Sequence, residues 1–143
     1  MIITFIGHSY YSEEIEDLQE HFSSLAINEK VDFYVGGYGK FDNFALDCAI
    51  KYREKQPKSK IFFITPYIYN GYYKINALKE KVDEVIYPGL ENVPPKFAIL
   101  KRNEWMIDKA DVVIAFVKYS WGGARTAYEY ALRKKKKIIN VAK

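Results

Sequence analysis

The hydrophobic positions of this chain alternate between short apolar runs and longer stretches with helical spacing. The run at 112–117 is apolar at every position, which is typical of a strand buried on both faces. Between the runs, residues such as Ile15, Leu18 and Phe22 recur three or four apart, which indicates amphipathic helices. Strands that alternate with helices favour an α/β fold, a three-layer Rossmann-like sandwich with a mainly parallel sheet. The predicted strands are 2–6, 31–35, 60–65, 83–87, 112–117 and 137–141.

Helices are expected between these strands. Ser12 is a suitable N-cap for a helix whose apolar stripe runs to Leu25. Pro94-Pro95 introduces a helix over 96–109, because proline suits a first helical turn. The stretch 67–73 contains an Asn-Gly pair and several tyrosines but no periodicity, which predicts a loop that can act as a lid. The other helices are predicted at 42–55 and between the glycines at 122–123 and the lysine run at 134–137.

Length and composition predict one folded domain spanning 1–143, because no linker, repeat or low-complexity segment divides the 143 residues. A hydrophobic content of 49% and an aromatic content of 17% exclude a disordered chain. The single cysteine, Cys48, excludes an internal disulfide and is compatible with a reducing compartment. No signal peptide or membrane-length apolar segment is found, so we expect a cytoplasmic protein that does not bind membranes.

Three of the predicted strands end in turns of small residues. In a parallel sheet such turns gather at the carboxyl edge, where ligands bind near the topological switch point. A Gly-Gly pair before a helix lets backbone N–H groups approach a phosphate at the positive end of the helix dipole. We therefore expect phosphates at 36–37 and 122–123, following strands that lie side by side, although tight turns without a ligand would have the same composition. The three turns are Gly7-His8-Ser9, Gly36-Gly37-Tyr38-Gly39 and Ser120-Trp121-Gly122-Gly123-Ala124.

Four polar side chains are candidates for contact with such a ligand. Asp42 is placed to cap the helix after the second turn, and Glu129 lies six residues beyond Gly123 on the helix after the third. Helical spacing leaves Arg102 near the edge of the core, where a guanidinium can grip a phosphate or stay on the surface. His8 either binds the ligand through a hydrogen bond or caps a neighbouring helix.

The aromatic residues are concentrated in the predicted loops. The chain has 13 tyrosines, and several fall between 67 and 73 or beside the glycine turns. One interpretation is a pocket in which Tyr38, Trp121 or the loop tyrosines stack on a base, and the other is the codon bias of an AT-rich genome.

The charge pattern bears on the partner. A net charge of +4 and a pI near 9.0 suit an anionic ligand. However, the run Arg133–Lys137 lies at a predicted helix end, where cations are favoured by the dipole and solvated. We therefore expect a small phosphate-bearing molecule, with nucleic acid an unlikely partner.

Several kinds of chemistry lack their motifs. His8, His21 and Cys48 are too far apart for metal-ligand spacing, so no metal is expected. The chain has no Gly-x-Ser-x-Gly elbow and no Walker A loop. The turn at 36–39 lacks the spacing of the dinucleotide fingerprint, so no cofactor is expected either.

The combination of motifs resembles the SLOG superfamily, and the likeness spans nearly the whole chain. The group includes the LOG phosphoribohydrolases, the DNA-processing protein DprA and sensor domains for nucleotide-derived signals. The LOG pattern is an Arg-Lys pair with a later methionine and then Pro-Gly-Gly-x-Gly-Thr-x-x-Glu. Gly7-His8 and Tyr34–Gly39 look most like an uncharacterised bacterial and phage branch. The matching residues are Arg102, Met106, Gly122, Gly123, Thr126 and Glu129, with Gly36, Gly37 and Asp42 at an earlier turn.

The chain departs from the LOG pattern at three positions. Asn103 stands where LOG enzymes have lysine, Trp121 replaces the proline, and Arg125 replaces a glycine. An arginine cannot easily copy a glycine backbone with positive φ, and it adds a charge that can pair with Glu129. The resemblance therefore implies a nucleotide-like ligand more strongly than it implies hydrolysis.

Three functions remain open on the sequence. The first is binding of a nucleotide or nucleotide-derived signal, such as an ADP-ribose derivative or a cyclic nucleotide, as a sensor or as a sequestering protein in phage or bacterial defence. The second, implied by the LOG enzymes, is hydrolysis of nucleoside monophosphates, with Glu129 stabilising a sugar cation and Arg102 holding the phosphate. The third is DprA-like nucleic-acid binding, and the resemblance also implies a homodimer or higher homo-oligomer. The candidate binding residues are Gly7, His8, Ser9, Gly36, Gly37, Tyr38, Gly39, Asp42, Arg102, Asn103, Ser120, Trp121, Gly122, Gly123, Ala124, Arg125, Thr126 and Glu129.

Overall fold

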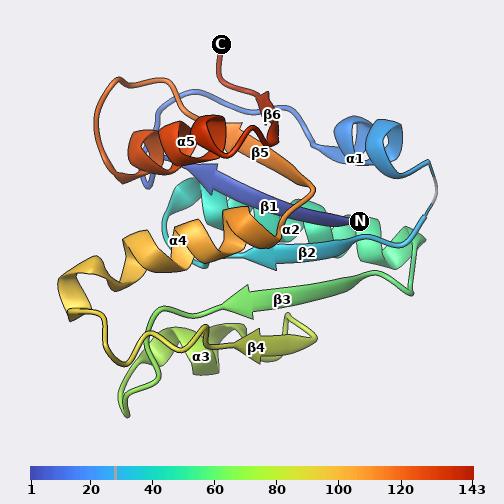
Figure 1. Ribbon diagram of the computed structural model, residues 1–143. Coiled ribbons are helices and arrows are strands. Elements are labelled where there is room, and N and C mark those ends of the chain that lie inside the picture. Colours follow the sequence, from blue (N-terminus) through green and yellow to red (C-terminus); the bar gives the residue numbers. More distant parts are fainter. Residues whose placement is uncertain (28) are drawn as a thin grey trace.

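The computed structural model describes residues 1–27 and 29–143, and its centre is a sheet of six parallel strands (Figure 1). The strand order is β4-β3-β2-β1-β5-β6. The strands are β1 (Ile2–Gly7), β2 (Asp32–Val35), β3 (Lys60–Ile64), β4 (Glu84–Ile86), β5 (Val112–Phe116) and β6 (Lys137–Asn140). The helices are α1 (Gln19–Ala26), α2 (Lys40–Lys55), α3 (Tyr73–Leu78), a 3₁₀ turn η1 (Pro95–Phe97), α4 (Ala98–Lys109) and α5 (Gly123–Arg133).

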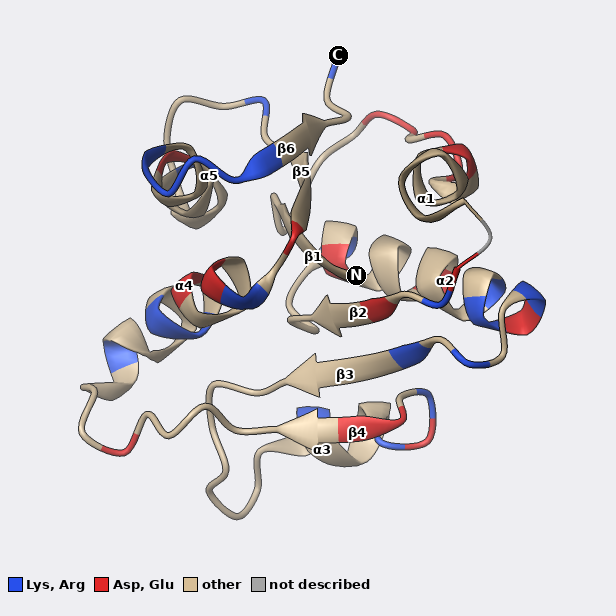
Figure 2. Ribbon diagram, turned by 45° about the vertical axis from the view of Figure 1, so that its right-hand side comes forward, with Lys and Arg blue, Asp and Glu red and all other residues tan. Residues whose placement is uncertain are grey.

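Helices cover both faces of the sheet, which confirms the predicted three-layer architecture. Figure 2 shows α4 and α5 on one side of the sheet and α1 and α2 on the other. Phe22 of α1, Ala45 of α2 and Leu78 of α3 pack with Phe5 and Phe33 in one core cluster. Ile107 of α4 and Ala127 of α5 pack in the other cluster with strand residues of the opposite face. Every residue of β5 is buried, as its unbroken apolar run predicts.

The order of the strands places the glycine turns differently from the prediction. The strands β2 and β5, which precede the turns at 36–39 and 120–124, flank β1 and do not pair with each other. The prediction that they lie side by side is therefore wrong. From β1 the chain adds β2, β3 and β4 toward one side of the sheet and then β5 and β6 on the other side of β1. The topological switch point therefore lies between β1 and β5, and the three turns surround it.

Local helix signals fail in two places. The predicted helix from Ser12 begins only at Gln19, and the segment before it runs irregularly. Tyr11 explains this because its ring is buried against Phe116, at 4.5 Å between centroids, and its carbonyl accepts a 2.8 Å hydrogen bond from Lys40 Nζ. Helix α3, which begins at the last residue of the predicted loop at 67–73, was also not predicted. None of the helices in the described part of the chain is long and apolar enough to span a membrane.

Candidate functional site

A pocket of about 460 Å³ opens at the switch point, between the loops that follow β1, β2 and β5 and the side of α4. Its position is the one expected for a ligand site in an open parallel sheet. Most of the predicted residues surround it. Those that line the pocket are Gly7, His8, Ser9, Tyr38, Asp42, Arg102, Asn103, Trp121, Gly122, Gly123 and Ala124.

Five further lining residues were not among the predicted site residues. Phe5 and Ile6 lie at the end of β1 and form part of the pocket wall. Ile99 is three residues before Arg102, so helical spacing places both on the same face of α4. Tyr119 is two residues before Trp121, and that spacing within an aromatic-rich turn could have marked it. Tyr10, one of the loop tyrosines, completes the set.

The start of α5 presents backbone donors to the pocket. Gly122 is the N-cap, with φ of +95°, a conformation that favours glycine. The first backbone N–H that bonds within the helix is that of Thr126, which donates to the Gly122 carbonyl at 3.1 Å. The N–H groups before it have no helical acceptor, and both Gly122 and Gly123 have open space where a side chain would stand. This end of the pocket is suited to an anion.

The glycines after β2 serve packing instead. Gly36, Gly37 and Gly39 do not line the pocket, and the first two are buried. Gly39 has φ of +92°, and a Cβ there would lie 2.5 Å from the Cα of Ser9. This close approach brings the loop after β2 against the loop after β1.

Arg102 is a buried brace within the pocket wall. Its side chain is 1% exposed, and Nη1 donates 2.8 Å hydrogen bonds to the carbonyls of Gly36 and Ile64. Its Nε donates to Asn103 Oδ1 at 3.0 Å. These bonds use three of the five guanidinium N–H groups, and Nη2 donates to no acceptor in the described part of the chain. Arg102 therefore ties α4 to the ends of β2 and β3.

Asp42 completes this buried polar group. Its Oδ2 accepts a 2.8 Å hydrogen bond from the backbone N–H of Tyr38, so Asp42 fixes the loop after β2. Asp42 itself lies in the first turn of α2, and the N-cap is Gly39. Burial raises the pKa of Asp42 to about 6, and the positive charge of Arg102 opposes this rise. Burial also lowers the pKa of Arg102, with Asp42 acting in the opposite direction. The two residues stabilise each other's charge inside the wall.

Exposed aromatic rings form the rim of the pocket. Trp121 is 68% exposed, and Tyr10 and Tyr38 are also more than half exposed although all three line the pocket. The rings of Trp121 and Tyr119 are stacked, with centroids 5.1 Å apart and planes 9° from parallel. A large ring held flat beside a pocket while its other face stays in solvent can stack on a planar ligand.

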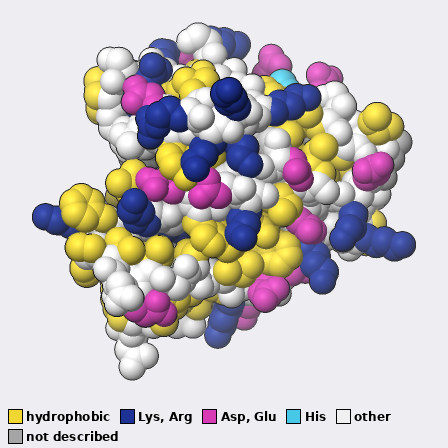
Figure 3. Space-filling model, viewed as in Figure 1, with side chains coloured by type: hydrophobic (Ala, Val, Ile, Leu, Met, Phe, Trp, Pro, Cys, Tyr) yellow, Lys and Arg dark blue, Asp and Glu magenta, His cyan; other side chains and the backbone are white. Residues whose placement is uncertain are grey.

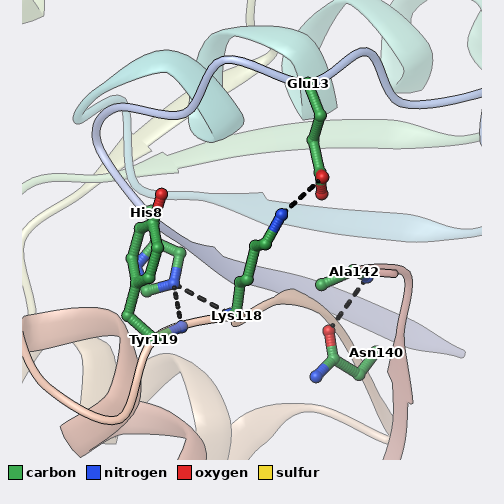
Figure 4. Close-up of polar contacts among 6 residues, drawn as sticks. All are labelled: His8, Glu13, Lys118, Tyr119, Asn140 and Ala142. Atoms are coloured by element: carbon green, nitrogen blue, oxygen red, sulfur yellow. Dashed lines mark hydrogen bonds and ion pairs between the residues drawn. The ribbon is translucent and has the colours of Figure 1, made fainter.

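His8 joins this rim to β1 (Figure 4). Its Nε2 accepts hydrogen bonds from the backbone N–H groups of Lys118, at 2.9 Å, and Tyr119, at 3.2 Å. Nε2 therefore carries no proton, and the neutral ring is protonated on Nδ1. The Tyr119 ring lies 4.6 Å from the His8 ring, and Lys118 Nζ is paired with Glu13 at 2.8 Å. His8 thus positions the loop after β5.

We expect the stability of this loop to depend on pH through His8. Burial lowers the pKa of His8 below its ordinary 6.5, so the folded state binds fewer protons than the unfolded state. Its contribution to the free energy of unfolding is present above about pH 6.5 and is lost as the pH falls below that value. Asp42, with its raised pKa, acts in the opposite direction, because its ionisation opposes folding as the pH rises.

The matched variant is His8→Gln, whose amide oxygen can replace Nε2 without titrating. The free energy of unfolding of each protein is measured in urea at each pH. Subtracting the value of the variant from that of the wild type removes the contribution of Asp42, which both share, and leaves the contribution of His8. A difference that stays constant from pH 7.5 to 5 would contradict the role of His8 as a neutral acceptor.

The remaining predicted residues lie outside the pocket lining. Arg125 Nε and Glu129 Oε1 form an exposed ion pair at 3.2 Å on α5. Thr126 Oγ1 donates to the Gly122 carbonyl at 3.2 Å, and Ser120 is exposed beside the rim. The Arg125–Glu129 contact is the pairing that the sequence suggested. In the described residues no group of three or more acidic, histidine or cysteine side chains is arranged to hold a metal.

Comparisons with known proteins give a likeness of fold. No model of a known protein family matches this chain, and no curated protein matches it. Among solved structures it is similar to DNA processing protein A from Helicobacter pylori, which was studied for its binding of single-stranded DNA. The TM-score is 0.62 at 19% identity, and the match covers 96% of this chain and 63% of that protein. At this identity the likeness shows the Rossmann-like fold, and the resemblance to the SLOG superfamily stays a prediction from the sequence.

The comparison corrects the prediction that nucleic acid is an unlikely partner, because a protein of this fold binds single-stranded DNA. That prediction rested on the lysine run, which joins the far end of α5 to β6 (Figure 2). An 11-residue helix separates this run from the pocket by about 16 Å. The run therefore carries no information about binding at the pocket, where aromatic rings from separate loops come together.

Proposed function

We propose that this chain binds single-stranded nucleic acid by holding one nucleotide unit in the pocket at the switch point. The observation that carries the proposal is the presence, in one pocket, of an exposed aromatic platform and of a helix N-terminus with free donors. Stacking on aromatic rings and contacts to phosphate are the two interactions on which proteins that bind single strands rely. The likeness of fold to a protein that binds single-stranded DNA supports the same reading.

Each part of the pocket has a role in this proposal. A phosphate accepts hydrogen bonds from the first backbone N–H groups of α5, beside Gly123 and Ala124. The base stacks on the solvent-facing side of Trp121, whose other face is supported by Tyr119. The free Nη2 of Arg102 supplies a charged donor from the wall, without the side chain leaving its carbonyl acceptors.

The salt dependence of binding tests this arrangement. Among the described residues that line the pocket, Arg102 is the single lysine or arginine, and the N-terminus of α5 adds a partial positive charge, so we expect one or two phosphates to be neutralised. The logarithm of the association constant for a thymidylate dinucleotide, which is short enough to occupy the pocket alone, should then fall with the logarithm of salt concentration with a slope of about −0.7 to −1.4. Trp121→Ala should weaken binding about 5- to 150-fold, the range for loss of one stacked base. Fluorescence anisotropy measures both quantities.

Leu132→Ala is the control for the tryptophan variant, because Leu132 is an exposed apolar residue near the other end of α5. Its affinity should equal that of the wild type. The proposal is wrong if oligonucleotides do not bind at low salt, or if Trp121→Ala binds them as tightly as the wild type does.

A free nucleotide or nucleotide-derived signal is a second candidate, favoured by the size of the pocket. About 460 Å³ lies within the range of roughly 300–1,000 Å³ that is usual for small-molecule sites. Mononucleotides that bind as tightly as oligonucleotides would favour this candidate, as would a nucleotide that co-purifies in native mass spectrometry. Glu129 lies outside the lining and is paired with Arg125, which supports binding over hydrolysis in either case.

A further inference from the structure

A second group of aromatic residues lies on the surface beyond the pocket. We call it the tyrosine surface, and it consists of the aromatic residues Tyr67, Tyr69, Tyr72, Tyr73 and Phe97 together with the exposed Ile68. Tyr69 is 60% exposed and Tyr73 is 67% exposed. The rings of Tyr67, Tyr69 and Tyr72 lie within 5.2–5.7 Å of one another, measured between centroids. Exposed aromatic side chains gathered in this way mark an interaction site.

The tyrosine surface is held together across two segments of the chain. Tyr67 donates a 3.0 Å hydrogen bond from its hydroxyl to the carbonyl of Pro95, just before α4. Thr65 Oγ1 in turn donates to the Tyr67 carbonyl at 2.7 Å. The loop after β3 is therefore tied to the start of α4. Figure 1 shows both segments at the end of the molecule toward which the strand arrows point.

This surface continues from the pocket along the same edge of the sheet. The loop that carries it follows β3, which is separated from β5 by β2 and β1. Three strand spacings of about 4.8 Å give about 14 Å between the carboxyl end of β3 and that of β5. Arg102 links the pocket to the start of the tyrosine surface, because it lines the pocket and its Nη1 donates a hydrogen bond to the carbonyl of Ile64, the last residue of β3.

Two lysines give the surface a positive charge. Lys74 Nζ lies 5.5 Å from the ring centroid of Tyr73, and Lys96 Nζ lies 5.1 Å from that of Phe97. In the described residues neither lysine forms an ion pair. Figure 3 shows hydrophobic side chains with a basic one beside them at the left end of the molecule, where α4 begins in Figure 1. Aromatic rings with cations suit a single strand, whereas interfaces between proteins are depleted in lysine.

We propose that the tyrosine surface is a second contact for the same single strand, which runs from the pocket along the carboxyl edge of the sheet. This proposal rests on the proposed function. A stacked single strand of nucleic acid rises about 3.4 Å per nucleotide, so about 14 Å corresponds to about four nucleotides beyond the one in the pocket. Bases stack on the rings of Tyr69 and Tyr73, and the lysines contact phosphates.

The test compares two lengths of oligothymidylate, a dinucleotide and an octanucleotide, by isothermal titration calorimetry. The octanucleotide should bind at least tenfold more tightly than the dinucleotide. The double variant Tyr69→Ala, Tyr73→Ala should lose at least fivefold in affinity for the octanucleotide and keep the wild-type affinity for the dinucleotide. Trp121→Ala should weaken both. Both tyrosines are mostly exposed, so circular dichroism should show an unchanged fold.

The outcomes separate this inference from the function on which it rests. If both lengths bind with equal affinity, or if the double variant loses nothing, the tyrosine surface does not contact the strand and the pocket remains the binding site. If neither length binds, the proposed function fails and this inference fails with it. If the double variant converts a dimer into a monomer in sedimentation velocity while the octanucleotide affinity is unchanged, the surface binds a second copy of the chain and our proposal is overturned.

Discussion

Replacing Arg102 with methionine should lower the free energy of unfolding by about 3–5 kcal/mol, the usual cost of removing one partner from a buried charged group. Methionine fills a similar volume but leaves the carbonyls of Gly36 and Ile64 without their donor. It also leaves Asp42 buried without the positive charge that opposes the rise of its pKa. Urea denaturation followed by circular dichroism measures the change.

Two further variants show whether the effect belongs to the buried guanidinium. Lys101→Met removes the neighbouring exposed cation, whose ion pair with Glu104 at 3.3 Å should be worth about 1 kcal/mol or less. Arg102→Lys keeps the charge but lacks the planar fork that reaches two carbonyls and Asn103 together, so it should also destabilise the fold. If Arg102→Met costs less than about 1 kcal/mol, the guanidinium does not brace the fold.

Replacing Gly123 with valine should reduce nucleotide or oligonucleotide affinity by more than tenfold, about 1.4 kcal/mol, while the fold is kept. Gly123 has no positive φ, and a Cβ there has open space around it, so the backbone at this position accepts a side chain without strain. Its branched side chain would stand over the first N–H groups of α5 and prevent a phosphate from approaching them. Titration calorimetry on the folded variant measures the loss.

The control for this variant is Thr126→Val, a nearly isosteric change on the same helix outside the pocket lining. It removes only the exposed hydrogen bond to the Gly122 carbonyl and should leave affinity within about twofold of the wild type. Gly122 is unsuitable for this test because its φ of +95° would strain any side chain. A folded Gly123→Val protein with wild-type affinity would place the phosphate elsewhere.

Arg102 and Gly123 have different roles in the pocket. Arg102 donates three hydrogen bonds to protein acceptors, so its replacement should mainly lower the stability of the fold. Gly123 makes no packing contact through a side chain, so its replacement should mainly lower the affinity for the ligand. If instead Arg102 served mainly to bind the ligand and Gly123 served mainly to stabilise the fold, replacing Arg102 would chiefly lower affinity and replacing Gly123 would chiefly lower stability.

The sequence by itself determined the elements and the fold class, because these depend on short-range patterns. The unbroken apolar run at 112–117 predicted a strand buried on both faces, and residues 112–116 of this run form β5 with every residue buried. The glycines at 122–123 after this run led correctly to a helix N-terminus. Alternation of such runs with helical periodicity led to a parallel sheet. Even the pairing of Arg125 with Glu129 follows from a spacing of four residues on one helix.

Only the tertiary structure decided which of these elements meet. The sequence placed Arg102 near the edge of the core, but its burial depends on carbonyls that lie 66 and 38 residues away in the chain. His8 gained its role from backbone donors 110 and 111 residues away, and Tyr11 kept its segment out of the predicted helix by packing on Phe116. The order of the strands placed β1 between β2 and β5 and brought separate aromatic residues to one edge. Such contacts follow from the packing of distant segments, which no local pattern of hydrophobic and polar residues encodes.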